Sequence, residues 1–254
     1  DQVALMAPIP APPQMRDCMC FEKHLQQAMD QAILRQAASS DDPVGAAEEL
    51  RASGRFKIPQ IWYDQPIYYK ANRFAVTGTG TDVVWPSYSH FMDYEMEFGI
   101  FIGKGGKDIP AERAREHIFG YTIFNDFSAR DAQMAEMAAQ LGPAKGKDFD
   151  NANVMGPCIV TADEFGDPYD HEMIVRVNGV EMSRGSSSEM HWTFEDVIAH
   201  ISQGETLHPG EFIGSGTVGD GCGLEHGRAL NAGDIVELEV SGIGVIRNRV
   251  LRND

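Results

Sequence analysis

Apolar positions recur at helical spacing between residues 17 and 36 of the chain. This spacing predicts a helix over 17–36, with Asp17 as its N-cap residue. The apolar face consists of Phe21, Leu25, Ala28 or Met29, and Ala32 or Ile33. Residues 1–15 are rich in proline and are expected to form an extended arm. Residues 38–55 are small and polar, which indicates a loop with one short helix.

From residue 59 onwards the pattern changes to short strand-like runs separated by Gly and Pro. Strands are predicted at 97–103, 120–125 and 156–165, hairpins at 173–183 and 234–250, and short helices at 111–118 and 193–202. The pair Asn178–Gly179 is a strong hairpin signal, and Thr193 with Asp196 resembles a capping box.

Strands dominate this region, and they do not alternate with helices as in a doubly wound sheet. We therefore predict an α+β fold that consists mainly of antiparallel sheet with short helices. Residues 59–254 are expected to form the main domain, and residues 1–58 to form an N-terminal arm and helical segment.

Composition excludes several classes of function. The chain has 254 residues and 43% are hydrophobic, which is enough for one large domain. No run approaches the roughly 18 apolar residues that a membrane span needs. The net charge of −17 argues against nucleic-acid binding, which needs clustered Lys and Arg.

The cysteines do not suggest a secreted protein. Cys18, Cys20, Cys158 and Cys222 are too few for a disulfide framework, and no CxxC pair is present. Cys18 and Cys20 are expected to be small buried residues rather than metal ligands. Without a recognisable signal peptide, a cytoplasmic location is the expectation.

Two glutamates fall on one face of a strand-like segment that reads MDYEMEFG between residues 92 and 99. Side chains alternate between the two faces of a strand, so Glu95 and Glu97 point the same way. Two carboxylates at this spacing repel each other, and burying them without compensation costs several kcal/mol. We therefore expect this pair to lie either in water or on a cation.

A second polar cluster, NDFSARDAQ, directly follows the apolar run GYTIF. Asp126 lies at the end of the predicted strand, where it could supply a third carboxylate oxygen. Ser128 and Asp131 are interpreted as helix-capping residues. Arg130 and Gln133 would share one face of a helix that starts there. The segment NDFSARDAQ is explained equally well as the ordinary start of a capped helix without a functional role.

Two glycine-rich segments lie further along the chain. GSGTVG, from Gly214 to Gly219, satisfies GxGxxG, but a loop follows it rather than a helix of a βαβ unit. We therefore reject it as a nucleotide site and expect these glycines to let the backbone pass close to a ligand or another strand. In GPAKGKDFD, Lys145 or Lys147 could face an anionic ligand, although solvated surface lysines are the commoner case.

In combination and in this order, these segments resemble the fumarylacetoacetate hydrolase family. The distinguishing stretches are DYEMEFGIFIG, GYTIFNDFSARDAQ, GKDF before MGP, and SGTVG before GLE. The resemblance covers the chain from about Pro66 to Val250 and includes the N-terminal helix more loosely. It implies a β-sandwich roll, and the family is commonly dimeric, so a homodimer is expected.

The resemblance implies a divalent cation, Mg²⁺ or else Mn²⁺ or Ca²⁺, held by carboxylates alone. Its ligands would be Asp17, Glu95, Glu97 and Asp126. All-oxygen ligation suits hard cations. The family's catalytic His stands seven positions after the N-terminal Asp, and His24 has that spacing from Asp17.

The resemblance also implies roles for other residues. His24 would act as general base, oriented by Glu225 from the GLE segment. The substrate and the developing carbanion would be held by Arg130, Gln133 and Lys147, with Lys145 as the alternative lysine. Tyr69 would contact the substrate, and Thr217 would bind its carboxylate.

Three functions are compatible with these residues. The favoured one is a metal-dependent hydrolase in which water activated by His24 cleaves a C–C bond of a β-diketo acid or acylpyruvate-like substrate, with a metal-stabilised enolate leaving. The alternative is a decarboxylase or tautomerase of oxaloacetate-like 2-oxo acids on the same site. The third is a non-enzymatic module with a structural Ca²⁺ site or a solvated acidic edge.

Overall fold

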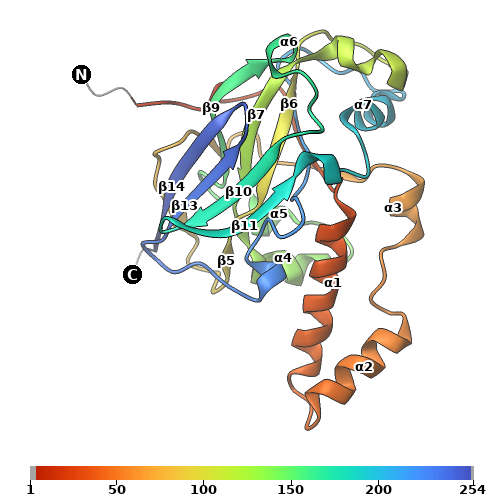
Figure 1. Cartoon of the computed structure of the whole chain (residues 1–254), viewed down its shortest axis with the longest axis vertical. Helices are drawn as coiled ribbons and strands as arrows, with labels where there is room; N and C mark the ends of the chain where they lie inside the picture. Colours follow the sequence, from red (N-terminus) through yellow and green to blue (C-terminus); the bar gives the residue numbers. More distant parts are fainter. Residues whose placement is uncertain (1–3, 253–254) are drawn as a thin grey trace.

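Two β-sheets packed face to face form the body of the protein, with the helices around them (Figure 1). The computed structural model describes residues 4–252. The strands are β1 Met15–Cys18, β2 Tyr68–Lys70, β3 Val76–Thr77, β4 Val83–Trp85, β5 Met92–Asp93, β6 Met96–Ile102, β7 Ile118–Asp126, β8 Ser128–Ala129, β9 Asn153–Thr161, β10 Glu172–Val177, β11 Val180–Ser186, β12 Phe212–Gly214, β13 Ile235–Val240 and β14 Gly244–Arg252.

The helices are short apart from the first two. They are α1 Glu22–Ala37, α2 Pro43–Ser53, α3 Gln60–Asp64, α4 Arg130–Met137, α5 Ala144–Lys147, α6 Ala162–Phe165 and α7 Phe194–Ser202, with 3₁₀ helices η1 Ala111–His117, η2 Ser187–Glu189 and η3 Leu224–His226. In the view of Figure 1, α1 and α2 extend from the lower end of the sheets, away from α6.

The larger sheet has seven strands in the order β2-β1-β12-β6-β7-β9-β3, and the smaller has five in the order β11-β10-β13-β14-β4. The pairs β1–β12, β3–β9 and β4–β14 are parallel, whereas all other strand pairs within the two sheets are antiparallel. The predicted α+β class with mainly antiparallel sheet is confirmed.

The centre of the larger sheet is apolar on both faces, which fits strands that are covered on both sides. All seven residues of β6 are buried. Phe98 and Ile100 belong to the main core together with residues of the smaller sheet such as Leu238. On the opposite face, Phe101 packs in a second apolar cluster with Phe212. The polar site residues described below are therefore embedded in a rigid, well-packed sheet.

The N-terminal prediction is wrong in one respect that matters for function. Helix α1 begins at Glu22, and its N-cap residue is Phe21, not Asp17. Asp17 lies instead in β1, which pairs in parallel with β12 and antiparallel with β2. Pairing with two strands satisfies the backbone groups of this segment, and this tertiary contact overrides the local helical pattern.

The local turn and cap signals fare better. Asn178 and Gly179 both have positive φ, as a two-residue turn between β10 and β11 requires. Thr193 and Asp196 form a reciprocal capping box at the start of α7. These signals need only neighbouring residues, so the sequence is sufficient to predict them.

The two capping residues predicted in NDFSARDAQ are not caps. The hydroxyl of Ser128 donates to the backbone oxygen of Asp126, and the Asp131 carboxylate accepts from the Ser89 hydroxyl and the His90 N–H. Helix α4 has no side-chain cap, because its N-cap residue is Ala129, which carries no polar group, and Asp131 instead holds the loop before β5.

Among residues 4–252, no helix is long and apolar enough to cross a membrane. Cys18, Cys20 and Cys222 are buried and Cys158 is exposed, and all four are free thiols, so the expected burial of the first two is confirmed. The domain boundary at residue 58, the homodimer and the cytoplasmic location stay predictions.

Candidate active site

Three carboxylates from three strands of the larger sheet meet at one point. Asp17 comes from β1, Glu97 from β6, and Asp126 is the last residue of β7. One oxygen from each lies within 4.8 Å of the other two, and all three residues are buried. We call this group the carboxylate cluster.

Two glycines of the GSGTVG segment make this convergence possible. A Cβ atom on Gly214 would lie 2.5 Å from Oδ1 of Asp17 and 3.2 Å from Oε2 of Glu97. The N–H of Gly216 donates to the same two oxygens, at 3.2 and 3.1 Å. The expectation that these glycines allow close backbone approach is confirmed, and the segment leads into a loop rather than a helix.

Burial and mutual repulsion keep protons on this cluster. Burial, with the nearby Asp126 carboxylate, raises the pKa of Asp17 to about 7. Burial and the Asp17 and Glu95 carboxylates raise the pKa of Glu97 well above its ordinary value. Burial also raises the pKa of Asp126 to about 6, although Lys147 opposes the rise. Such a cluster favours a compensating positive charge.

Glu95 sits next to the cluster but is paired with cations of the chain. Its carboxylate accepts hydrogen bonds from Lys147 Nζ and from Arg130 Nη1. Burial raises the pKa of Glu95, but Lys147 and Arg130 outweigh it and hold the value at about 2. Its predicted role as a fourth metal ligand stays a prediction.

Lys147, and not Lys145, reaches the site. Lys147 is buried at the end of α5, and its ammonium also donates to Oδ2 of Asp126 over 2.7 Å. Lys145 is exposed and lies over the ring of Tyr88. Of the two lysines that could face an anionic ligand, Lys147 is therefore the one that lies against the carboxylates.

The donor chemistry fits a hard divalent cation. The carboxylate cluster offers oxygen alone, which Mg²⁺, Mn²⁺ and Ca²⁺ accept. Among the described residues, Oδ1 of Asp126 has no hydrogen-bond partner although it is buried. An unsatisfied buried carboxylate oxygen is costly, and a cation bound there would satisfy it.

The remaining predicted substrate residues line the same region. The Tyr69 hydroxyl donates to Oδ2 of Asp126 over 2.5 Å. Gln133 accepts from Arg130 Nη1 at 3.0 Å, so the predicted shared face of these two is confirmed. The Thr217 hydroxyl lies 3.4 Å from Oε1 of Glu97. Their roles towards a substrate stay predictions.

A histidine–glutamate pair stands beside the carboxylates. His24 Nδ1 lies 2.7 Å from Oε1 of Glu225, and the other carboxylate oxygen of Glu225 accepts from the N–H of Cys222. Cys222 in turn forms an isolated β-bridge with Glu95. We call His24 and Glu225 the dyad.

Helix α1 is attached to the loop that carries Glu225. Gln27 exchanges two hydrogen bonds with Asp220, and Lys23 forms an ion pair with the same carboxylate at 2.8 Å. Gln31 donates to the backbone oxygen of Glu225. These contacts hold His24 against the loop and so fix the dyad.

The comparisons with known proteins decide the family. A family profile described as "Fumarylacetoacetate (FAA) hydrolase C-terminal" matches residues 37–251. The chain belongs to the fumarylacetoacetate hydrolase family. The resemblance drawn from the sequence is thereby confirmed, and so is membership of a family of enzymes. Asp17 and His24 lie before the matched residues.

Known members of the family differ in reaction. The human protein "Oxaloacetate tautomerase FAHD2A, mitochondrial" is 37% identical over 188 residues, which is 74% of this chain and 59% of that protein. The chain thus matches less than two thirds of the length of this relative.

Solved structures of fumarylacetoacetate hydrolase family proteins match nearly the whole chain. Fumarylacetoacetate hydrolase from Exiguobacterium antarcticum is 28% identical with a TM-score of 0.75, over 100% of this chain and 80% of the other. A probable 2-hydroxyhepta-2,4-diene-1,7-dioate isomerase from Mycobacterium abscessus is 26% identical with a TM-score of 0.76, over 100% and 81%. The fold is shared across these different reactions.

One buried residue of this family member was missed by the sequence reasoning. The Asp93 carboxylate accepts from Arg130 Nε at 2.8 Å and from the N–H groups of Gly223 and Leu224. It ties Arg130 to the loop that carries Glu225. The sequence did contain a signal for this residue. Asp93 stands two positions before Glu95, and side chains at that spacing in a strand lie on the same face.

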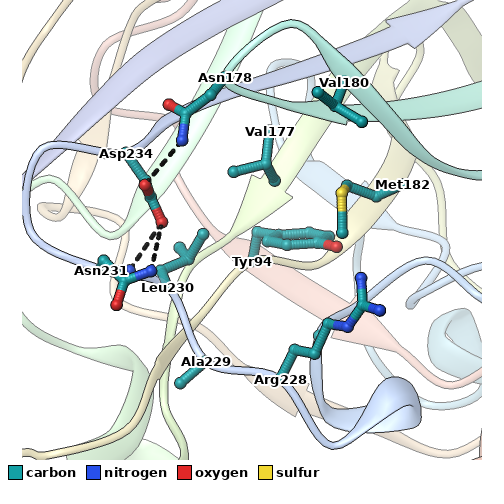
Figure 2. A pocket seen from close by; sticks show the side chains of 11 residues that line it. Tyr94, Val177, Asn178, Val180, Met182, Arg228, Ala229, Leu230, Asn231 and Asp234 are labelled. Carbon is teal, nitrogen blue, oxygen red and sulfur yellow. Dashed lines mark hydrogen bonds between the residues drawn. The ribbon is translucent and has the colours of Figure 1, made fainter.

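A separate hollow of about 370 Å³ is lined in part by residues of this loop (Figure 2). Its walls are Tyr94, Val177, Asn178, Val180, Met182, Gly223, Arg228, Ala229, Leu230, Asn231 and Asp234. In Figure 2, Asp234 joins Asn178 and Asn231 at one edge. None of the predicted site residues lines this hollow, so the chemistry is assigned to the carboxylate cluster and the dyad.

Proposed function

We propose that this protein is a divalent-metal-dependent hydrolase that cleaves a C–C bond in a β-diketo acid or acylpyruvate-like substrate. The observation that carries the proposal is the His24–Glu225 hydrogen bond beside the carboxylate cluster. A metal site alone suffices for enolisation, whereas hydrolysis also needs a base for water.

The cation would be held by Asp17, Glu97 and Asp126. When bound, Mg²⁺ or Mn²⁺ supplies Lewis-acid polarisation of the substrate's carbonyl and carboxylate oxygens. Because the three carboxylates come from strands β1, β6 and β7 of one packed sheet, the ligand positions are preorganised. The substrate would meet this site together with the ammonium of Lys147, which is buried between Glu95 and Asp126.

The dyad performs the proton transfer. Glu225 accepts from Nδ1–H of the His24 imidazole, which leaves Nε2 as the basic nitrogen. His24 takes a proton from water, and the resulting hydroxide attacks the carbonyl carbon. The C–C bond then breaks, and the carbon that keeps the electron pair takes up a proton, so that two acids are released.

Lys147 and Arg130 stabilise negative charge as it develops. Both are buried, and Glu95 and Asp93 hold them in place by hydrogen bonds. Preorganised cations in a site of low dielectric stabilise a developing oxyanion or carbanion more than water does. Tyr69 and Thr217 would contact the polar groups of the substrate.

A second candidate is a decarboxylase or tautomerase acting on oxaloacetate. It is favoured by the human relative named as an oxaloacetate tautomerase, at 37% identity. Tautomerisation moves a proton between carbon and oxygen, and decarboxylation breaks a C–C bond to release CO₂ and then protonates the carbon that keeps the electron pair. Neither reaction needs an attacking water. The carboxylate cluster and Lys147 would suffice for it, and the dyad would be dispensable.

The two candidates are separated by their products. The protein is incubated with an acylpyruvate and, separately, with oxaloacetate, each with Mg²⁺ or with EDTA. Two carboxylic acids formed from the acylpyruvate, and lost with EDTA, support the hydrolase. An accelerated keto–enol exchange or CO₂ release from oxaloacetate, with the acylpyruvate unchanged, would reject it in favour of the second candidate.

A further inference from the structure

His24, Cys222 and Glu225 form a second group of metal-ligand residues, distinct from the carboxylate cluster. One donor atom from each lies within 4.8 Å of the other two. The group combines an imidazole nitrogen, a thiol sulfur and a carboxylate oxygen. The carboxylate cluster, in contrast, offers oxygen alone.

This difference in donors implies a difference in the preferred metal. Mg²⁺ and Ca²⁺ prefer oxygen ligands, whereas Zn²⁺ is bound by cysteine, histidine and carboxylate together. Three protein ligands with a fourth position for water is the usual composition of an open zinc site. The second group therefore suits a softer cation than the one that the carboxylate cluster would hold.

The backbone holds two of these ligands in place before any metal binds. The N–H of Cys222 donates to Oε2 of Glu225 at 2.9 Å. The isolated bridge between Cys222 and Glu95 anchors one side of the loop, and the hydrogen bond from Gly223 N–H to Asp93 anchors the next residue. Ligands fixed by outer hydrogen bonds bind metals more tightly than free side chains.

One ligand of this group is partly exposed. Cys222 is fully buried, but the His24 side chain keeps 13% of its surface exposed. Of the three ligands, His24 is therefore the one that contacts solvent, whereas the thiol and the carboxylate are buried.

We propose that His24, Cys222 and Glu225 bind Zn²⁺ and that this binding switches off the dyad. If the ion takes Nε2 of His24, it occupies the lone pair that a general base needs. If it takes Nδ1, that nitrogen gives up its proton and the neutral ring carries its proton on Nε2 instead, which then cannot accept another. The thiol proton of Cys222 is released to the buffer as the zinc–thiolate bond forms, with no change of oxidation state.

Binding and inhibition rest on different grounds. Zinc binding follows from the ligand geometry alone. Inhibition also rests on the proposed function, in which His24 activates water.

Binding is tested with Co²⁺ as a visible substitute for Zn²⁺. The full chain is saturated with Mg²⁺, so that the oxygen site is filled, and is then titrated with Co²⁺. A thiolate-to-cobalt charge-transfer absorption is expected, and Zn²⁺ is expected to abolish it because Zn²⁺ binds such donors more tightly. Absence of this absorption in the wild-type protein would overturn the proposal.

Matched cysteine variants assign the absorption. Cys222→Ser should lose it, while Cys158→Ser, at an exposed thiol away from the group, should keep it. An absorption that persists in Cys222→Ser shows that another thiol binds the metal and rejects the site. If Cys222→Ser fails to fold, His24→Ala takes its place, and it must weaken Co²⁺ binding at least about tenfold.

Inhibition is measured with an acylpyruvate at fixed Mg²⁺, and each variant is compared with its own rate without zinc. The Zn²⁺ concentration for half-inhibition should rise about 10–100-fold in Cys222→Ser and stay constant in Cys158→Ser. Equal inhibition of both variants would mean that zinc acts at the carboxylate cluster instead. If the Co²⁺ absorption is present but no substrate is turned over, the proposed function fails and the metal site stands.

Discussion

Nδ1 of His24 lies 2.7 Å from Oε1 of Glu225, although 201 positions separate the two residues. One is carried by α1 and the other by η3. The buried carboxylate orients the imidazole. In the proposed hydrolysis it would also stabilise the imidazolium that forms when His24 takes a proton. This arrangement connects the N-terminal helix to the chemistry proposed for the sheet.

Removal of the imidazole should abolish hydrolysis without affecting the metal. For His24→Ala we expect kcat on an acylpyruvate to fall about 10²–10⁴-fold, since general-base catalysis contributes that much. Calorimetric titration should show unchanged Mg²⁺ binding, because the cluster carboxylates are intact. Full activity in this variant would reject His24 as the base.

Loss of one cluster carboxylate should weaken metal binding directly. For Asp17→Asn we expect Mg²⁺ affinity to fall by at least tenfold, because a charged oxygen ligand is replaced by a neutral one. Isothermal titration calorimetry gives the affinity. Asp163→Asn, at an exposed aspartate in α6, is the matched control and should bind Mg²⁺ like the wild type. Equal affinity in both variants would remove Asp17 from the ligand set.

A methyl group at Gly214 should disrupt the cluster sterically. Its Cβ would lie 2.5 Å from the Asp17 carboxylate, well inside van der Waals contact. Gly214→Ala is therefore expected to lose Mg²⁺ binding and activity together. In Gly233→Ala the new Cβ meets open space, although φ is positive, so this control should lose some stability and retain Mg²⁺ binding. Normal metal binding by Gly214→Ala would contradict the geometry.

Lys147 and Lys145 should behave differently when the charge is removed. Lys147→Met leaves Glu95 and Asp126 without their shared cation, and breaking such a buried pair costs about 3–5 kcal/mol of stability. Thermal melting should show this loss, and turnover should fall as well. Lys145→Met, at an exposed position, should change neither quantity measurably. A turnover defect confined to Lys145→Met would reverse the assignment.

The metal-free protein should become less stable as the pH rises through neutrality. In the folded state the pKa of Asp17 is about 7 and that of Asp126 about 6, both above the ordinary aspartate value. At a pH between the ordinary value and the raised value, the folded state therefore holds protons that the unfolded chain has lost. Their stabilising contribution is complete at low pH and is lost as pH rises through 6 to 7. Melting temperatures of the EDTA-treated protein should therefore fall from pH 5.5 to pH 8, and saturating Mg²⁺ should reduce the fall.

The Asp17→Asn variant provides the control for this pH series, because it cannot lose a proton at position 17. Its melting temperature should depend less on pH than that of the wild type. A wild-type melting temperature that rises over the same pH interval would contradict the pKa shifts.

The local pattern was enough to predict the longer strands and several site residues, but not short strands such as β1 and β12. β6 and β7 follow from mainly apolar runs, and Glu95 and Glu97 share a face because side chains alternate along a strand. The Asn178–Gly179 turn and the Thr193 capping box follow from neighbouring residues alone. The order of these motifs also identified the family, which the comparison confirmed.

Only the tertiary structure decided which groups meet. The local sequence pattern predicts Asp17 as a helix N-cap residue. Pairing of β1 with β12 and β2 instead places Asp17 in the sheet beside Glu97. The carboxylate cluster, and the pairing of Glu95 with Lys147 and not with the other acids, depend on contacts between segments far apart in the chain. A linear pattern records only which residues are near in sequence, whereas charge compensation inside a protein depends on which residues are near in space.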